Sequence, residues 1–180
     1  MKEISFKNIK KDKFIYKVAL LLLGWIHHYN HNKYWKMRQE VINPNSKKSI
    51  ITRLWYLYRI KRSDAFNNAT MGTDLNSGAI FATPPNLPHY LNGIFISHYA
   101  IIGKNCTIYQ QVTISQGPNN EPTIIGDNVV IGAGAKIIGS VKIGDNVKIG
   151  ANAVVVDDIP SNSIAVGVPA RVISREKKKK

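Results

Sequence analysis

Residues 125–160 read IGDNVV IGAGAK IIGSVK IGDNVK IGANAV VVDDIP, and this stretch decides the fold. An aliphatic residue opens every unit of six, and the fifth residue of each unit is apolar and usually small. The opening residues are Ile125, Ile131, Ile137, Ile143, Ile149 and Val155, and the fifth residues are Val129, Ala135, Val141, Val147, Ala153 and Ile159. A period of six is neither helical nor simply alternating. It predicts a short strand followed by a tight turn.

The same period extends toward the N-terminus. Ile96, Ile102, Ile108 and Ile114 keep it among themselves, and Cys106 and Val112 occupy fifth positions. The positions after the aliphatic residue are rich in Gly, Asn and Asp, which tolerate the positive φ of tight turns. Three units would form one triangular coil, and stacked coils would bury a column of Ile and Val. We therefore predict that Cys106 is a small core residue and not a nucleophile.

The period is interrupted twice. Between Ile114 and Ile125 the step is eleven residues, and the intervening SQGPNNEPTI, residues 115–124, has the composition of a loop. A stacked coil can extrude such a loop without disturbing its neighbours. The second interruption, residues 83–93, reads TPPNLPHYLNG, and its three prolines exclude regular strand pairing.

The repeats resemble those of the hexapeptide-repeat acyltransferases, in particular the serine acetyltransferases and their sugar-modifying relatives. The resemblance covers about residues 70–173 and includes GTDL at 72–75, LPH at 87–89, IYQQVTI at 108–114, IGAGAKIIG at 131–139 and the closing AVGVPARVI at 165–173. It implies an all-β core folded as a left-handed parallel β-helix. The left hand comes from the resemblance alone, because the general rule for parallel crossovers favours the right hand.

The resemblance also implies a catalytic pair, Asp74 and His89. Family members carry an Asp in a GxD motif and a His fifteen residues later on adjacent coils, and this chain reproduces that spacing. A carboxylate that accepts one imidazole N–H leaves the other nitrogen free to act as a base. His98 occupies a turn position and needs no functional explanation, so we expect it to be structural or, at most, to contact the acceptor.

The implied reaction is acetyl transfer from acetyl-CoA to a hydroxyl, without a metal. Ala133 and Ala151 match positions at which family members bind the cofactor through the backbone, although small residues also suit tight turns. Ser115 is a candidate oxyanion donor through its backbone N–H. Arg171 and Arg175, with Lys177–Lys180, are candidate contacts for the CoA phosphates, since guanidinium groups match phosphate geometry; the lysines are equally explained as a solvated tail.

Three positions argue against serine as the acceptor. Serine acetyltransferases carry an Asp before the catalytic His and an Arg-His pair in the extended loop, where this chain has Pro88, Asn120 and Glu121. Without the Arg, the carboxylate of serine would stay unpaired in the pocket, which is costly. We therefore expect a neutral hydroxyl on a sugar or a surface polysaccharide precursor, with Asn120, Glu121 and His98 as candidate acceptor contacts.

The ends of the chain are basic. Residues 1–66 carry 15 Lys and Arg against 4 Asp and Glu, a net charge of +11, whereas residues 67–172 carry 5 against 6. Residues 12–30 and 47–62 have helical patterns, with Ile50, Leu54, Leu57 and Tyr58 on one side of the second and Asn45 or Ser46 as its N-cap. These helices either cap the first coil or form a basic amphipathic surface on the inner leaflet of a membrane.

Three domains follow: a helical cap at 1–66, the β-helix at 67–173 with its loop at 115–124, and a basic tail at 174–180. The single cysteine excludes disulfides within the chain, and we expect a cytoplasmic protein. If the helices form the basic amphipathic surface, the protein is peripheral at the inner face of the membrane. No nucleic-acid motif is recognisable. The resemblance implies a homotrimer whose active sites are shared between subunits. The alternatives are a serine O-acetyltransferase of cysteine biosynthesis, an N-acetyltransferase on an amino sugar, or a β-helix scaffold without catalysis.

Overall fold

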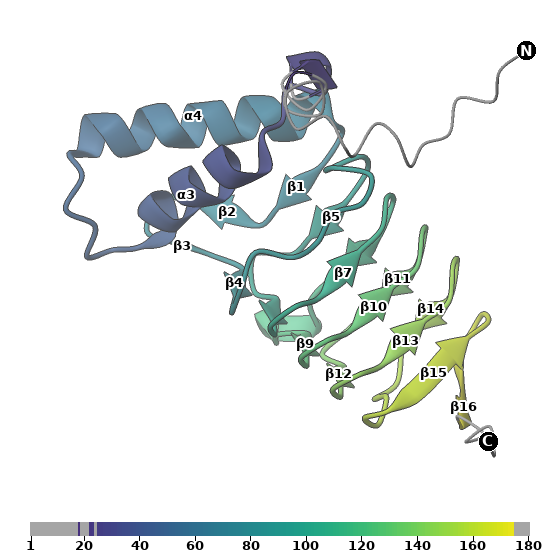
Figure 1. Ribbon diagram of the computed structural model, residues 1–180. Helices are drawn as coiled ribbons and strands as arrows, with labels where there is room; N and C mark the ends of the chain where they lie inside the picture. Colours follow the sequence, from purple (N-terminus) through teal and green to yellow (C-terminus); the bar gives the residue numbers. More distant parts are fainter. Residues whose placement is uncertain (1–17, 19–21, 24, 175–180) are drawn as a thin grey trace, which may run out of the picture.

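The computed structural model describes residue 18, residues 22 and 23, and residues 25–174. Stacked coils of short strands form a parallel β-helix, and two helices, α3 (His31–Ile42) and α4 (Ile50–Phe66), lie at its N-terminal end (Figure 1). Of the predicted helix over 12–30, residues 18, 22, 23, 25 and 26 are helical and residues 27–30 are not, and the others lie outside the described residues. No helix in the described part of the chain is long and apolar enough to cross a bilayer.

The strands form three sheets, which are the three faces of the β-helix. Sheet 1 contains β1 (Thr70–Met71), β5 (Phe95–Ile96), β8 (Thr113–Ile114), β11 (Lys136–Ile137) and β14 (Val154–Val155). Sheet 2 contains β7 (Thr107–Ile108), β10 (Val130–Ile131), β13 (Lys148–Ile149), β15 (Ser163–Val166) and the antiparallel β16 (Arg171–Ser174). Sheet 3 contains β4 (Ile80–Phe81), β6 (Ile101–Ile102), β9 (Ile124–Ile125) and β12 (Lys142–Ile143). A small hairpin, β2 (Thr73–Asp74) with β3 (Ser77–Gly78), precedes the regular coils.

The register confirms that three six-residue units make one coil. Ile137 pairs with Val155, and Ile125 pairs with Ile143, each eighteen residues further along the chain. All the aliphatic and fifth-position residues predicted to point inward are buried, including Cys106, which is fully covered. Burial raises the pKa of the Cys106 thiol, which disfavours the thiolate. The prediction that Cys106 is a core residue is confirmed.

The turns explain why the repeats are rich in asparagine. Asn128, Asn146 and Asn162 have a φ near +60° and stack directly below one another. The Asn128 side-chain amide donates to Asn146 Oδ1 at 3.2 Å, and the Asn146 amide donates to Asn162 Oδ1 at 3.0 Å. Asparagine therefore adopts the left-handed backbone of the turn and also links each coil to the next.

The two helices cover the open end of the β-helix through a buried arginine. The Arg38 guanidinium, only 2% exposed, donates to the carbonyl oxygens of Ala79 at 2.6 Å and Met71 at 3.1 Å, and to Thr73 Oγ1 at 2.9 Å. These groups belong to the first coil, whose upper side has no further coil to pair with. Their pairing with α3 blocks an edge that would otherwise be open to another strand.

The helical boundaries differ from the predicted ones. The sequence pattern did not identify α3, and α4 begins and ends later than residues 47–62. Its N-cap is Ser49, whose side chain accepts from the Thr52 N–H, and not Asn45 or Ser46. A serine at this position satisfies one of the free N–H groups of the first turn, which fixes where the helix starts.

Candidate functional site

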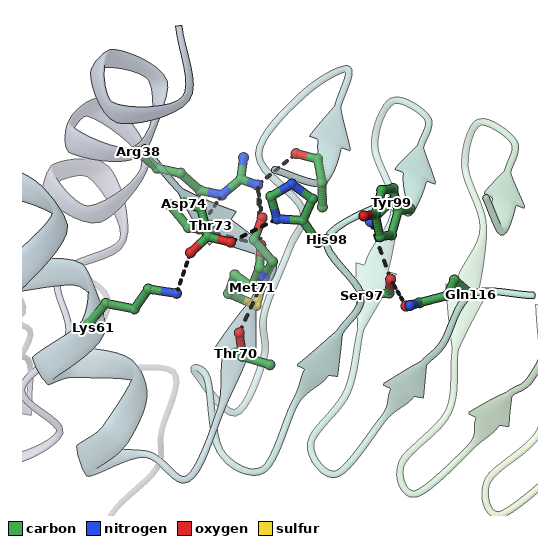
Figure 2. Close-up of polar contacts among 12 residues, drawn as sticks. Arg38, Lys61, Thr70, Met71, Thr73, Asp74, Ser97, His98, Tyr99 and Gln116 are labelled. Atoms are coloured by element: carbon green, nitrogen blue, oxygen red, sulfur yellow. Dashed lines mark hydrogen bonds and ion pairs between the residues drawn. The ribbon is translucent and has the colours of Figure 1, made fainter. Parts of the chain in front are cut away.

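Asp74 contacts Lys61 and His98 on the surface of the first coil (Figure 2). Its Oδ2 lies 2.9 Å from Nδ1 of His98, and its Oδ1 lies 3.2 Å from Nζ of Lys61. The Asp74 side chain is 58% exposed and the His98 side chain 31%. Because His98 directs Nδ1 toward the carboxylate, Nε2 points elsewhere. This arrangement is typical of a carboxylate that orients an imidazole for proton transfer.

The predicted pairing of Asp74 with His89 is wrong within one chain. Asp74 lies between β1 of sheet 1 and β4 of sheet 3, and His98 follows β5, which stacks directly on β1. His89 instead follows Asn86, which bridges to Thr107 of sheet 2. The two positions therefore lie on different edges of the triangular coil, although their spacing in sequence matches the family motif.

Two edges of the β-helix carry the candidate residues. The His89 edge consists of the turns that lead from sheet 2 to sheet 1, residues 87–94, 109–112, 132–135 and 150–153. The His98 edge consists of the turns that lead from sheet 1 to sheet 3, residues 97–100, 115–123, 138–141 and 156–158, together with Asp74.

The His89 edge brings together three of the predicted residues. His89 is exposed, and its ring lies 6.0 Å from that of Tyr109 in the next coil. Backbone hydrogen bonds continue the stack: the Gly134 N–H donates to Gln110 O, and the Asn152 N–H donates to Ala133 O. His89, Ala133 and Ala151 thus follow one another along a single edge, as the cofactor prediction requires.

Two features of this edge were not predicted. An added Cβ on Gly132 would lie 2.6 Å from the Ala151 backbone N, so only glycine allows the two coils to approach so closely. Gln110 Oε1 is buried without a hydrogen-bond partner among the described residues. A buried acceptor of this kind is ordinarily hydrogen-bonded, so this oxygen is an exception in the described part of the chain. No pattern in the sequence distinguishes Gln110 from the neighbouring Gln111.

Ser97 and Gln116 meet on the His98 edge, where the 115–124 loop leaves β8 (Figure 2). The Ser97 hydroxyl donates to Gln116 Oε1, and Gln116 Nε2 donates to Asn120 Oδ1 at 3.3 Å. Glu121 is exposed, and its N–H donates to Pro118 O at 3.2 Å. The candidate acceptor residues His98, Asn120 and Glu121 therefore share one edge. Sequence reasoning missed Ser97, Gln116 and Lys61, which hold this edge together.

The prediction for Ser115 is wrong. Its backbone N–H donates to Ile137 O at 2.9 Å, as part of the ladder between β8 and β11. An oxyanion donor must be free to meet the charge that develops in the transition state, and this N–H is already used. The hydroxyl of Ser115 instead accepts from the Gly139 N–H at 3.3 Å, which ties the base of the loop to the next coil.

Arg171, the described one of the C-terminal candidates, lies at the far end of the His89 edge. The turn at residues 167–170 is joined to it because the Val154 N–H donates to Gly167 O at 3.0 Å. Arg171 follows this turn, opens β16 and is exposed. Arg175 and Lys177–Lys180 lie outside the described residues. Within the described ranges, no three side chains of His, Cys, Asp and Glu gather closely enough to hold a metal ion.

Comparisons with known proteins agree with this architecture. The family described as bacterial transferase hexapeptide (six repeats) matches residues 122–157. Together with the parallel coils, this match supports a left-handed β-helix.

The chain is similar to the serine acetyltransferase of Mycobacterium tuberculosis strain ATCC 25618 / H37Rv, with 40% identity over 114 residues, covering 61% of this chain and 49% of the relative. It is also similar to that of Synechococcus elongatus strain ATCC 33912 / PCC 7942 / FACHB-805, with 43% identity over 108 residues, 58% of this chain and 43% of the relative. The crystal structure of Brucella abortus strain S19 serine acetyltransferase in complex with coenzyme A superposes with a TM-score of 0.59 and 26% identity, covering 84% of this chain and 54% of that one. The chain spans about half the length of the curated relatives it matches.

Proposed function

We propose that this chain, whose β-helix belongs to the hexapeptide-repeat acyltransferases, transfers an acetyl group from acetyl-CoA to a hydroxyl. The observation that carries the proposal is the alignment of His89, Ala133, Ala151 and the 167–170 turn along one edge. Strands in neighbouring coils lie about 4.8 Å apart. The four steps from His89 to this turn therefore span roughly 19 Å, a track along which an extended cofactor arm can lie.

In this proposal the backbone of Ala133 and Ala151 contacts the arm, and Arg171 meets phosphate at its far end. Small side chains and the close approach at Gly132 leave the backbone accessible on this edge. The Brucella relative binds coenzyme A on the same fold, which supports the assignment of the donor.

His89 acts as the general base. It removes the proton from the acceptor hydroxyl while the oxygen attacks the thioester carbonyl, and the carbon–sulfur bond then breaks. The imidazolium returns the proton to the departing thiolate, so CoA leaves as a thiol and the acceptor leaves as an ester. A positioned general base contributes roughly 10²–10⁴-fold to such a rate.

The complete site spans two copies of the chain. Within one chain, His89 and Asp74 lie on different edges, so the carboxylate cannot orient this histidine. If the His89 edge of one subunit packs against the His98 edge of the next, the base and donor track face the neighbour's 115–124 loop and its Asp74–His98 pair. A homotrimer would close this arrangement three times.

The proposed acceptor is a neutral hydroxyl, as on a sugar. The 115–124 loop contains no Lys or Arg, and Asn120 is already hydrogen-bonded to Gln116. A carboxylate on the acceptor would find no bidentate partner in this loop. L-Serine is the second candidate, favoured by the names of the relatives.

The test is CoA release from acetyl-CoA by the purified full-length protein, with L-serine and a panel of sugars and oligosaccharides as acceptors. Release with a sugar and not with serine supports the neutral acceptor, and release with serine alone overturns it. His89→Ala is expected to lower kcat by roughly 10²–10⁴-fold, with His98→Ala as the matched variant. If only His98→Ala abolishes the rate, the observed Asp74–His98 pair is the catalytic one and our assignment of His89 is wrong.

A further inference from the structure

The face of α4 that points away from the β-helix is apolar. Ile51 is 77% exposed, Leu54 49%, Trp55 55%, Tyr58 53% and Phe66 57%. The face that packs inward is largely polar, because Arg53, Ser63 and Asp64 are its buried residues together with Ile60. A surface helix ordinarily shows the opposite distribution. We call the five exposed side chains the α4 stripe.

Four members of the α4 stripe lie close together along the helix, whereas Phe66 lies eight residues beyond Tyr58 and packs against the His28 ring. Ile51, Trp55 and Tyr58 follow one another at spacings of four and three residues, so they share one side of the helix. The Trp55 and Tyr58 rings stack with centroids 5.4 Å apart, and the Arg59 guanidinium lies 5.9 Å from the Trp55 ring. The stripe therefore presents a preformed aromatic surface with cations beside it.

A second exposed apolar segment adjoins the stripe. Leu22 is 57% exposed, Trp25 76% and Ile26 56%. Trp25 and the α4 residues Arg59 and Arg62 line the same cavity of about 320 Å³. Trp25 of this segment thus lies at a cationic hollow that it shares with α4.

The charges around this surface are of one sign. Lys47, Lys48, Arg59 and Arg62 are all exposed. Over residues 25–66 the acidic residues are Glu40 and Asp64, of which Asp64 is buried and Glu40 is half-buried and hydrogen-bonded to Ser46. A second copy related by a two-fold axis would bring these cations against the same cations. An exposed apolar stripe does not suit nucleic acid, whose surface is dominated by phosphate.

We propose that the α4 stripe binds the surface of an anionic phospholipid bilayer. Its apolar and aromatic side chains enter the interface, where Trp and Tyr are preferred, and the flanking cations contact lipid phosphates. The net charge of +11 on residues 1–66 adds attraction to such a surface. Since α3 and α4 lie at the opposite end of the molecule from β16 (Figure 1), the coils project away from the membrane.

The test is co-sedimentation of the full-length protein with vesicles of phosphatidylcholine alone and with about 30% phosphatidylglycerol, which supplies the anionic headgroups of the proposal. We expect binding only to the anionic vesicles. Leu54→Ser with Trp55→Ser should weaken it by roughly tenfold or more, and Arg59→Gln with Arg62→Gln by roughly 30-fold. Ile80→Ser, which removes a similarly exposed apolar side chain from β4, is the matched control and should bind as the wild type does.

Binding to anionic vesicles that persists in the stripe variant overturns the proposal, because other basic segments then suffice. The proposal is also overturned if the wild-type protein does not co-sediment with the anionic vesicles. A smaller oligomer of the stripe variant in light scattering, without lipid binding by the wild type, would identify a second copy as the occupant. Circular dichroism of each variant establishes that it is folded. Membrane binding and acetyl transfer are measured separately, so either can fail alone.

Discussion

The carboxyl group of Asp64 in α4 is buried where this helix contacts α3. The Tyr34 hydroxyl donates to its Oδ1 at 2.7 Å, and its Oδ2 has no hydrogen-bond partner among the described residues. Burial raises the pKa of Asp64 to about 6, against the partial opposition of the Tyr34 hydrogen bond and of nearby cations. Near neutral pH, this junction between the helices and the β-helix therefore contains a charge that it poorly accommodates.

Asp64→Asn should consequently change how stability depends on pH. The pKa of Asp64 in the folded protein, about 6, exceeds its ordinary value of 3.8. The bound proton therefore stabilises the folded state fully below pH 3.8, and this stabilisation is lost as the pH rises through about 6. The loss amounts to about 3 kcal/mol. Asparagine keeps an acceptor for Tyr34 and does not ionise. Denaturant unfolding at pH 3.5 and pH 7 should show the variant gaining this much relative to wild type, and a constant difference would contradict the assignment.

The candidate residues could be found from the sequence only in part. The motifs around Asp74, His89, Ala133 and Ala151 identified positions that lie on two edges, but not which edge each one occupies. The irregular stretch 83–93 hides the coil register, so counting residues paired Asp74 with His89, while stacking of β5 on β1 pairs it with His98. The prediction that the Ser115 N–H binds an oxyanion was wrong for a related reason. Only the strand register shows that this N–H already donates to Ile137 O.

At the scale of elements, the strands were more predictable than the helices. Two-residue strands with one inward position have a strict period, and every predicted inward position is buried. The helices have an apolar side too, but a pattern cannot say whether that side faces the core or solvent. In α4 it faces solvent, and the buried Arg53 and Asp64 would have been assigned to the surface. The sequence pattern did not identify α3 because one of its buried positions is Arg38. A search for periodic apolar residues counts an arginine as a surface residue.

The asparagine turns predict an order of stabilities at position 146. Asn146→Ala forces a Cβ-bearing residue without side-chain hydrogen bonds into a φ of +57°, which costs roughly 1–2 kcal/mol. Asn146→Gly also loses both hydrogen bonds to Asn128 and Asn162 but adopts this backbone freely. Denaturant unfolding should rank wild type above Asn146→Gly and Asn146→Ala lowest. Equal losses for Gly and Ala would show that the backbone conformation contributes little.

The Arg38 network predicts a local loss of structure. Arg38→Ala removes the donor for the carbonyls of Met71 and Ala79 and should cost about 3 kcal/mol at this junction. Because each coil contacts only its neighbours, the effect should be confined to the helices and the first coil. Hydrogen exchange should speed up in α3 and β1 but not in β10 or β13. Arg59→Ala, which removes an exposed arginine of α4, is the control, and exchange that speeds up uniformly would contradict a local cap.

For the whole molecule, the separation of the two edges is the decisive feature. Along the His89 edge lie the proposed base and the donor track, and on the His98 edge lie Asp74 and the loop proposed to meet the acceptor. A triangular cross-section presents these edges in different directions. If the proposed function is correct, a monomer carries both halves of the machinery but not one complete site, and activity is a property of the assembly.

This arrangement predicts complementation between two inactive proteins. His89→Ala damages one edge and Asp74→Ala the other, so each variant on its own should lose most of its activity, roughly 10²-fold or more for the histidine. When the two are unfolded and refolded together, some interfaces pair an intact His89 edge with an intact His98 edge. We expect CoA release to recover to a substantial fraction of the wild-type rate, and only in the mixture. Refolding each variant alone is the control. If the mixture stays inactive while an affinity tag on one variant co-purifies the other, the site lies within one chain, and the Asp74–His98 pair becomes its centre.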